Sequence, residues 1–140
     1  MNKYNIKKLY CVSQVKLDDI ILEPRVPNNF MTKNKFEDYI TQRICFSKTI
    51  DGCLSALSMN LDNKKLYVYI LDNISKHDIY EPSIEEVPDC KITHEVWCLD
   101  PCTVSYYKTI LVTGSYDKEY KYIYGNGKIA SLYRWKYEVI

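Results

Sequence analysis

One amphipathic helix is the feature that most constrains how this chain can fold. Its apolar residues share the spacing of a single helical stripe: Ile50, Cys53, Leu54, Leu57 and Leu61. Ser47 comes just before the stripe and is a residue type suited to an N-cap. Asp51 lies in the first turn, where its negative charge interacts favourably with the positive end of the helix dipole. We therefore expect a helix from Thr49 to Met59 whose apolar stripe packs on a sheet.

Most of the remaining chain has the pattern of β-strands. Alternating or β-branched and aromatic segments predict strands at 9–13, 43–46, 65–71, 93–99, 104–113, 120–124 and 130–140. Gly114 is predicted to start a turn, and Gly125-Asn126-Gly127 to close a terminal hairpin. Segment 77–80 is predicted to be extended, Ser83 and Glu86 have capping-box spacing, and 28–39 reads as a long loop. The fold class is thus α+β, with six or seven mostly antiparallel strands and one main helix.

Length and composition narrow the range of functions. The 140 residues suit one domain spanning 1–140, and a net charge of +1 gives no basic face for duplex nucleic acid. No apolar run is long enough to span a membrane. The polar N-terminal stretch MNKYNIKKLY lacks the apolar core of a signal peptide, so we expect a cytoplasmic protein with reduced cysteines. The abundance of Lys, Asn, Ile and Tyr hints at an AT-rich genome, such as a low-GC bacterium or its phage, which would place the protein in the host cytoplasm.

A metal site is not expected from the spacing of possible ligands. The six cysteines include no CxxC pair, and the segment between the closest two, Cys98 and Cys102, contains Asp100 and Pro101. Only two histidines accompany them. We therefore predict no metal ligands, and the sequence identifies none of the cysteines as reactive.

The arginines suggest an anion site. Arg25 and Arg43 are two of only three arginines, beside sixteen lysines, and Arg25 lies between Pro24 and Pro27, which stiffen the backbone. A planar guanidinium can grip phosphate with two parallel hydrogen bonds, which lysine cannot do. The plainer interpretation is that both arginines form surface ion pairs with nearby acidic residues: Glu23, Glu37 and Asp38.

Three short motifs carry a family resemblance. LYCVS ends the first predicted strand, RICFS ends the second before the helix, and TxExW lies in a later strand. Over nearly its full length the chain resembles a family of small bacterial and phage proteins with LYHVS, PRxPxN, RxCFSxSIxxCLxAL and TGExW. More remotely, the order resembles the ADP-ribosyltransferase fold, as in rifampin-modifying transferases and tRNA phosphotransferases.

The remote resemblance implies an NAD-binding site. In that fold a first-strand His bonds the ribose, a second-strand Ser or Tyr lies near nicotinamide, and a later Glu orients the nucleophile. By motif position, Cys11 takes the place of the first-strand His, and Ser13 belongs to the same motif. Ser47 lies at the position of the second-strand Ser or Tyr, and Glu95 at that of the later Glu. A thiol is a poor substitute for imidazole as a hydrogen-bond donor, so Cys11 departs from the pattern.

Each of these residues also has a plainer role open to it. Glu95 can face solvent, Ser47 can serve only as an N-cap, and Cys11 can be a small core residue. Tyr67 and Tyr69 share one strand face, where they either stack on a base or nicotinamide or pack as ordinary strand tyrosines.

Three functions stay open at this point. The first is binding of a small nucleotide, NAD-derived or cyclic, as in phage anti-defence proteins that sequester a nucleotide immune signal. The second is an active ADP-ribosyltransferase or NAD-glycohydrolase that uses Glu95, with NAD as substrate. The third is a protein-inhibitor or interaction module with a tyrosine-rich surface, whose partner is another protein.

Overall fold

The structure, a computed structural model, describes residues 6–18, 20–26, 41–57, 60–87, 90–123 and 129–140. These residues form one sheet-rich α+β domain. Its strands are β1 (Tyr10–Ser13), β2 (Ile21–Leu22), β3 (Ile44–Ser47), β4 (Lys65–Leu71), β5 (Ile79–Tyr80), β6 (Glu95–Cys98), β7 (Cys102–Ile123) and β8 (Ile129–Val139). Its helices are α1 (Ile50–Ala56), α2 (Cys90–Thr93) and the 3₁₀-helix η3 (Ile74–Lys76).

The strands form a single sheet in the order β2-β7-β4-β1-β3-β6-β5, with β8 paired to β7. Every pairing is antiparallel, which confirms the predicted sheet type. The described residues contain eight strands rather than six or seven, because β2 and β5 form in addition while the predicted strands 104–113 and 120–124 belong to one strand, β7.

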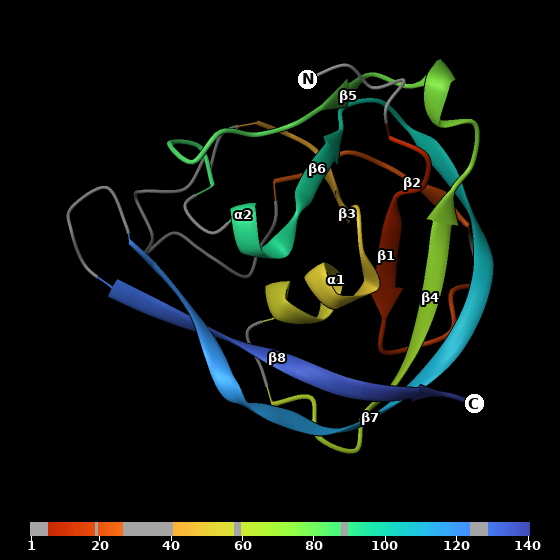
Figure 1. Cartoon of the computed structure of the whole chain (residues 1–140). Helices are drawn as coiled ribbons and strands as arrows, with labels where there is room; N and C mark the ends of the chain where they lie inside the picture. Colours follow the sequence, from red (N-terminus) through yellow and green to blue (C-terminus); the bar gives the residue numbers. More distant parts are fainter. Residues whose placement is uncertain (1–5, 19, 27–40, 58–59, 88–89, 124–128) are drawn as a thin grey trace.

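The sheet curls around α1, which lies in its concavity (Figure 1). The α1-side core is formed by Ile50, Leu54, Leu61, Leu66, Val68, Ile110 and Val112. The far-side core, on the opposite face of the sheet, is formed by Ile6, Leu9, Ile44, Phe46, Tyr69, Leu71, Val96, Cys98, Cys102 and Val104. Both faces of the central strands are thus buried, so their side chains alternate between two apolar environments.

The main helix is shorter than its stripe predicts. It begins at Ile50, and Thr49 is the N-cap, since the Gly52 N–H donates to Thr49 Oγ1 at 2.9 Å. The prediction of Ser47 as N-cap is wrong, because Ser47 is the last residue of β3. The helix ends at Ala56, with Leu57 already extended, and Met59 lies outside the described residues. Within the described ranges, no helix combines the length and apolarity needed to cross a membrane.

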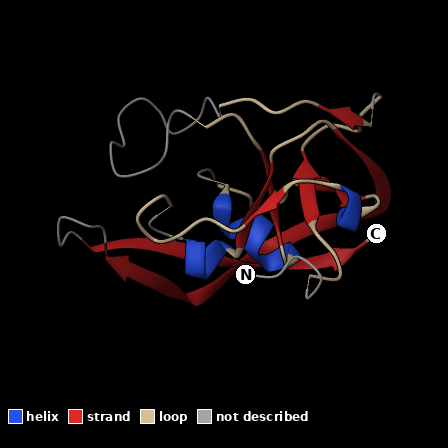
Figure 2. Cartoon of the chain, turned by 90° about the horizontal axis from the view of Figure 1, so that it is seen from above, coloured by secondary structure: helices blue, strands red, loops and turns tan. Residues whose placement is uncertain are grey.

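Strand β7 does not end where the sequence predicts. Instead of turning at Gly114, the chain continues to Ile123, and the pairing with β8 shifts register between Val112 and Gly114. Gly114 has φ +146°, a conformation open to glycine, so the residue makes a bulge inside a long strand. The outer half of the β7–β8 hairpin projects from the body of the sheet (Figure 2). The predicted turn at Gly125-Asn126-Gly127 and the predicted loop at 28–39 lie outside the described residues.

The segment before β6 contains a helix that was not predicted. The predicted strand at 93–99 is only Glu95–Cys98, and α2 occupies Cys90–Thr93 before it. The predicted turn at Ser83 does form, since the Ser83 carbonyl accepts hydrogen bonds from the N–H groups of Glu86 and Val87. The Ser83 N–H also donates to Glu86 Oε1 at 3.1 Å, which is the contact that a capping box predicts.

Candidate functional site

Two chain corners meet at one end of the β3–β6 pair. One corner leads from β3 into α1, and the other from α2 into β6. Ser47 Oγ donates to the Thr93 carbonyl at 2.6 Å, and the Lys48 N–H donates to the His94 carbonyl at 3.1 Å. Gly52 packs so closely on Thr93 that no side chain fits between α1 and α2 at this point. We call the residues around this contact the corner site.

His94 turns the chain from α2 into β6. Its φ of +54° is the left-handed conformation, and its N–H donates to the Cys90 carbonyl at 2.9 Å. This is the αL arrangement that closes a helix C-terminus, usually on glycine or asparagine. Histidine is among the residue types other than glycine that adopt this conformation most readily.

Two adjoining cavities flank the corner site. The first has a volume of about 410 Å³ and is lined by Lys48, Glu81, Pro82, Ser83, Ile84, Cys90, Lys91, His94 and Glu95. The second has a volume of about 310 Å³ and is lined by Thr49, Asp51, Gly52, Ser55, Lys91, Ile92, His94 and Arg134. Both volumes fall within the range of about 300 to 1,000 Å³ that is common for small-molecule sites. Lys91 and His94 line both cavities, so they form the wall between them.

The cavities contain both charged pairs and further basic groups. In the first, Lys48 forms an ion pair with Glu81. In the second, Arg134 forms one with Asp51 at 3.3 Å. Among the salt bridges of the described residues, none involves Lys91 or His94. The shared wall therefore carries the ammonium group of Lys91 and the imidazole of His94.

Glu95 lies in the wall of the first cavity and is held there by its neighbour on the same strand face. Its Oε2 atom accepts a hydrogen bond from Trp97 Nε1 at 2.6 Å. Trp97 is itself fully buried and packs against Tyr80 of β5, with ring centroids 5.5 Å apart. This contact fixes the position of the Glu95 carboxyl group while leaving the residue half-buried at the cavity.

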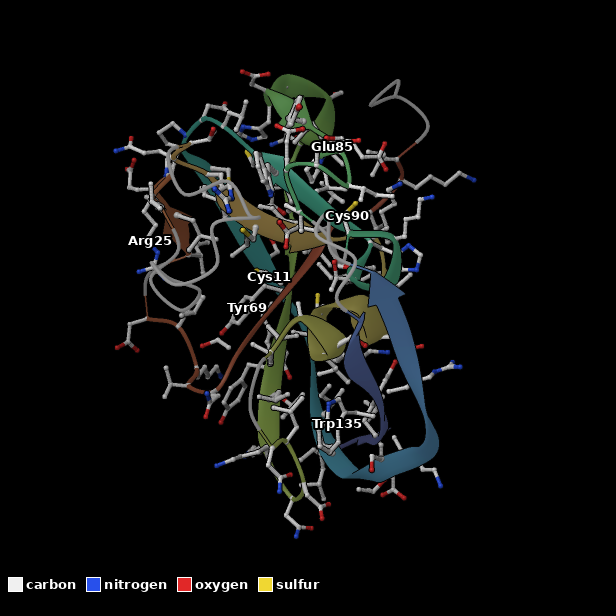
Figure 3. The ribbon with its side chains drawn as sticks, turned by 90° about the vertical axis from the view of Figure 1, so that its left-hand side faces the viewer. Cys11, Arg25, Tyr69, Glu85, Cys90 and Trp135 are labelled. Carbon is white, nitrogen blue, oxygen red and sulfur yellow. The ribbon has the colours of Figure 1, made fainter. Side chains whose placement is uncertain are left out.

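The two arginines do not converge on a common volume. Arg43 is 2% exposed, its guanidinium carbon lies 4.1 Å from the Trp97 ring centroid, and its Nη1 donates to the Thr41 carbonyl at 2.9 Å. Arg25 is exposed, and the two residues pair through their backbones, with N···O distances of 3.0 and 2.9 Å. Figure 3 shows Arg25 far from Cys90, which lines the first cavity. Arg25 and Arg43 therefore do not form the shared anion site that the sequence suggests, because Arg43 packs inside the protein on Trp97.

The first-strand residues lie away from the corner site. Cys11 is the register partner of Tyr69 and packs against the far-side core (Figure 3). Burial, and then the neighbouring Cys102, raise the pKa of the Cys11 thiol to about 12. The Ser13 hydroxyl group donates to the Val15 carbonyl at 2.6 Å and accepts from the Val15 N–H at 3.2 Å.

The two strand tyrosines share one face, as the alternation predicts, and serve packing there. Tyr69 is 1% exposed, accepts a hydrogen bond from the Leu17 N–H at 2.9 Å, and packs edge-on against Tyr106. Tyr67 is half-buried, and Lys65 Nζ lies 5.6 Å from its ring centroid. The Tyr69 ring is therefore inaccessible to a base or nicotinamide in this structure.

Of the three motif residues Cys11, Ser47 and Glu95, the structure brings Ser47 and Glu95 together. Ser47 and Glu95 are register partners on β3 and β6, and Tyr10 is the β1 partner of Ser47. Cys11, one residue further, faces the other side of the sheet. Ser47 is 3% exposed, and its hydroxyl joins Thr93 to the start of α1, so its role at the corner site is structural.

Sequence analysis did not identify the basic residues of the corner site: Lys48, Lys91, His94 and Arg134. Lys48 was detectable, because it follows the RICFS motif directly. Lys91 and His94 depend on α2, whose four residues give no periodic signal. Arg134 reaches the second cavity only through the β7–β8 hairpin, a contact that no local pattern predicts.

Comparisons with protein-family models, with curated proteins and with solved structures found no match to this chain.

Proposed function

We propose that the corner site binds a small phosphate-bearing molecule, either an NAD-derived or a cyclic nucleotide. The observation that carries this proposal is the wall shared by the two cavities, where Lys91 and His94 lie beside Glu95. Basic side chains at adjoining hollows of this size suit an anion with more than one charged group. The ligand is therefore expected to span the wall, with phosphate at Lys91.

The arrangement of the strands supports an ADP-ribosyltransferase-like site. β1, β3 and β6 are neighbours in the sheet, and the Ser47 and Glu95 positions lie side by side. Cys11 faces away, so the contribution that the first-strand residue makes in that fold is missing here. The combination favours retained binding over catalysis. A chain that holds such a ligand tightly would act by withholding it, as anti-defence proteins do with nucleotide signals.

The first test is whether the purified protein carries a nucleotide. Mass spectrometry of small molecules released on denaturation should detect one, and calorimetry with ADP-ribose, NAD and cyclic nucleotides should rank the candidates. Lys91→Ala and His94→Asn should weaken binding about ten- to a hundredfold, the value of one charge-assisted hydrogen bond. Asparagine suits the left-handed conformation of His94, so this variant removes the imidazole and keeps the turn.

Lys64→Ala is the matched control, since Lys64 is exposed in the turn after Leu61, away from both cavities. The proposal fails if wild type binds none of these nucleotides, or if the control weakens binding as much as Lys91→Ala does.

One observation favours catalysis as the alternative: the Trp97 hydrogen bond holds the Glu95 carboxyl group at the cavity, as an orienting acid requires. Glu95→Gln keeps an oxygen that can accept from Trp97 Nε1 and removes the charge. An ADP-ribosyltransferase or NAD-glycohydrolase would lose NAD turnover in this variant while retaining affinity. Absence of nicotinamide release by wild type over a long incubation would exclude this alternative.

A further inference from the structure

A second group of chemically reactive side chains lies at the other end of β6. His77 Nδ1 is 2.9 Å from Asp100 Oδ2, and Cys98 Sγ is 3.3 Å from Asp100 Oδ1. One ligand atom from each of the three residues lies within 4.8 Å of the other two. Imidazole, thiol and carboxyl group therefore point at one small volume.

The sheet fixes all three residues in place. Cys98 is the last residue of β6 and the register partner of Ile79 in β5. His77 ends η3 just before β5, and Asp100 follows β6 by two residues. The Leu99 N–H donates to the Asp78 carbonyl at 2.9 Å, and the Asp78 N–H donates to Asp100 Oδ1 at 3.0 Å. The group is thus preformed by backbone contacts rather than by surface side chains that meet by chance.

The surroundings combine a buried ligand with an open side. Cys98 is fully buried in the far-side core, where its thiol also contacts that of Cys102. The side chains of His77 and Asp100 are 15% and 39% exposed, so solvent reaches the group from their side. A preformed site with a route from solvent is what a bound ion needs.

We propose that His77, Cys98 and Asp100 form a metal site for zinc. Sulfur, nitrogen and oxygen ligands together suit Zn²⁺, whereas Mg²⁺ and Ca²⁺ take oxygen ligands alone. Zinc bonds of about 2.0 to 2.3 Å in a tetrahedron place ligand atoms about 3.3 to 3.8 Å apart. His77 Nδ1 and Asp100 Oδ2, now 2.9 Å apart, would separate by about 0.4 Å. A pair of ligand atoms at the 4.8 Å limit would move closer by about 1 Å. When the Cys98 sulfur binds zinc, its proton passes to solvent, and water takes the fourth position. No spacing in the sequence predicts this site, because His77 and Cys98 become neighbours only when β5 pairs with β6.

Cobalt(II) titration of the metal-free protein tests the site, since Co²⁺ takes the place of Zn²⁺ and absorbs light when bound to thiolate. We expect one equivalent to bind with a sulfur-to-cobalt charge-transfer band, and added Zn²⁺ to remove the band. Cys98→Ser should abolish the band, and His77→Ala should weaken binding at least tenfold. Cys45→Ser is the matched control, because Cys45 is exposed and lies on the other face of the sheet from Cys98. Its register partner on β6 is Trp97, the residue before Cys98.

Thermal unfolding provides a second readout that does not depend on colour. Zn²⁺ should raise the Tm of wild type and of Cys45→Ser, and leave that of Asp100→Asn unchanged, since an ion that binds only the folded state stabilises it. Asparagine keeps the shape of Asp100 and still accepts from the Asp78 N–H, so this variant should fold. The proposal is overturned if wild type binds no Co²⁺ or Zn²⁺, or if Cys98→Ser gives the same cobalt spectrum as wild type.

Discussion

Arg43 has a different role in the structure from the one that the sequence suggests. A scarce arginine at the start of a predicted strand suggests a ligand-gripping group, yet here its guanidinium stacks on buried Trp97. A buried, desolvated cation over an indole ring contributes about 2 kcal/mol or more. Arg43 therefore acts through Trp97, which in turn holds Glu95 at the first cavity.

Arg43→Lys should destabilise the protein by about 1 to 3 kcal/mol, because lysine keeps the charge but loses the planar stack and the bond to the Thr41 carbonyl. Urea unfolding followed by tryptophan fluorescence measures the loss. Arg25→Lys is the control and should change the free energy of unfolding by less than about 0.5 kcal/mol, since the Arg25 side chain is exposed. Unchanged stability of Arg43→Lys together with weakened nucleotide binding would instead return Arg43 to the role of a ligand contact.

Cys11 should be unreactive in the folded protein. Burial raises its thiol pKa to about 12, so at neutral pH it carries its proton and is not a nucleophile. Alkylation with iodoacetamide at neutral pH, followed by peptide mass spectrometry, should label exposed Cys45 first and Cys11 only in denaturant. Labelling of native Cys11 at the rate of Cys45 would contradict the burial argument.

At the scale of elements, the contact between α1 and α2 depends on Gly52. A Cβ atom there would collide with the Thr93 carbonyl, which is backbone, and with Ser47 Oγ. Neither can move without breaking the Ser47–Thr93 hydrogen bond, so α2 would have to shift away from α1. The closeness of the two helices, and with it the corner site, rests on this glycine.

Gly52→Ala should therefore cost about 1 to 3 kcal/mol or more, even though alanine is the better helix former. Ala56→Ser, on the exposed end of the same helix, should stay within about 0.5 kcal/mol of wild type. Differential scanning calorimetry of the two variants makes the comparison. A Gly52→Ala protein as stable as wild type would show that α2 can move at no cost.

Elements with a complete local pattern were predicted well. Strand β4 has the predicted bounds, and the buried residues of the helix stripe include Ile50, Cys53 and Leu54. Short elements were predicted poorly. The helix α2, for example, has only four residues, which are too few to show a repeated helical spacing of apolar residues. Gly114 misled the strand prediction for another reason: an isolated glycine permits a bulge as well as a turn, and the pairing with β8 decides between them.

The candidate sites were predicted less completely, because sites depend on strand pairing. Glu95 was identified by its motif, and its pairing with Ser47 follows from β3 and β6 being neighbours. The separation of Cys11 from Ser47 depends on register, since a shift of one residue exchanges the two faces of a strand. No single-sequence pattern fixes a register between strands so far apart in the chain.

The whole molecule should lose stability in alkali through its buried thiols. Burial raises the pKa values of Cys11 and Cys53, whereas an unfolded thiol titrates near pH 8.5. Below that pH the two thiols contribute fully to the free energy of unfolding. Above it the unfolded state releases protons that the folded state keeps, so stability falls as the pH rises toward the pKa values of the folded protein. The expected slope is on the order of 1 kcal/mol per pH unit for each thiol.

Urea midpoints between neutral pH and about pH 11 measure this slope. Cys11→Ala combined with Cys53→Ala should flatten the alkaline limb relative to wild type, and Cys45→Ala should not, so that the ionisation of tyrosines cancels in the comparison. An equal slope in all three proteins would assign the loss to other groups.

The strand order also bears on how the chain acquires its structure during synthesis. Among the described strands, only β5 with β6 and β7 with β8 are neighbours both in sequence and in the sheet. β1, in the middle of the sheet, has no partner until β3 is made, and β2 has none until β7 is made. Pairings between distant segments form slowly, because a long loop must close before any contact stabilises it. In a nascent chain β1 therefore stays unpaired until β3 emerges, and β2 until β7 emerges, so the yield in a cell should depend on chaperones that shield these strands in the meantime.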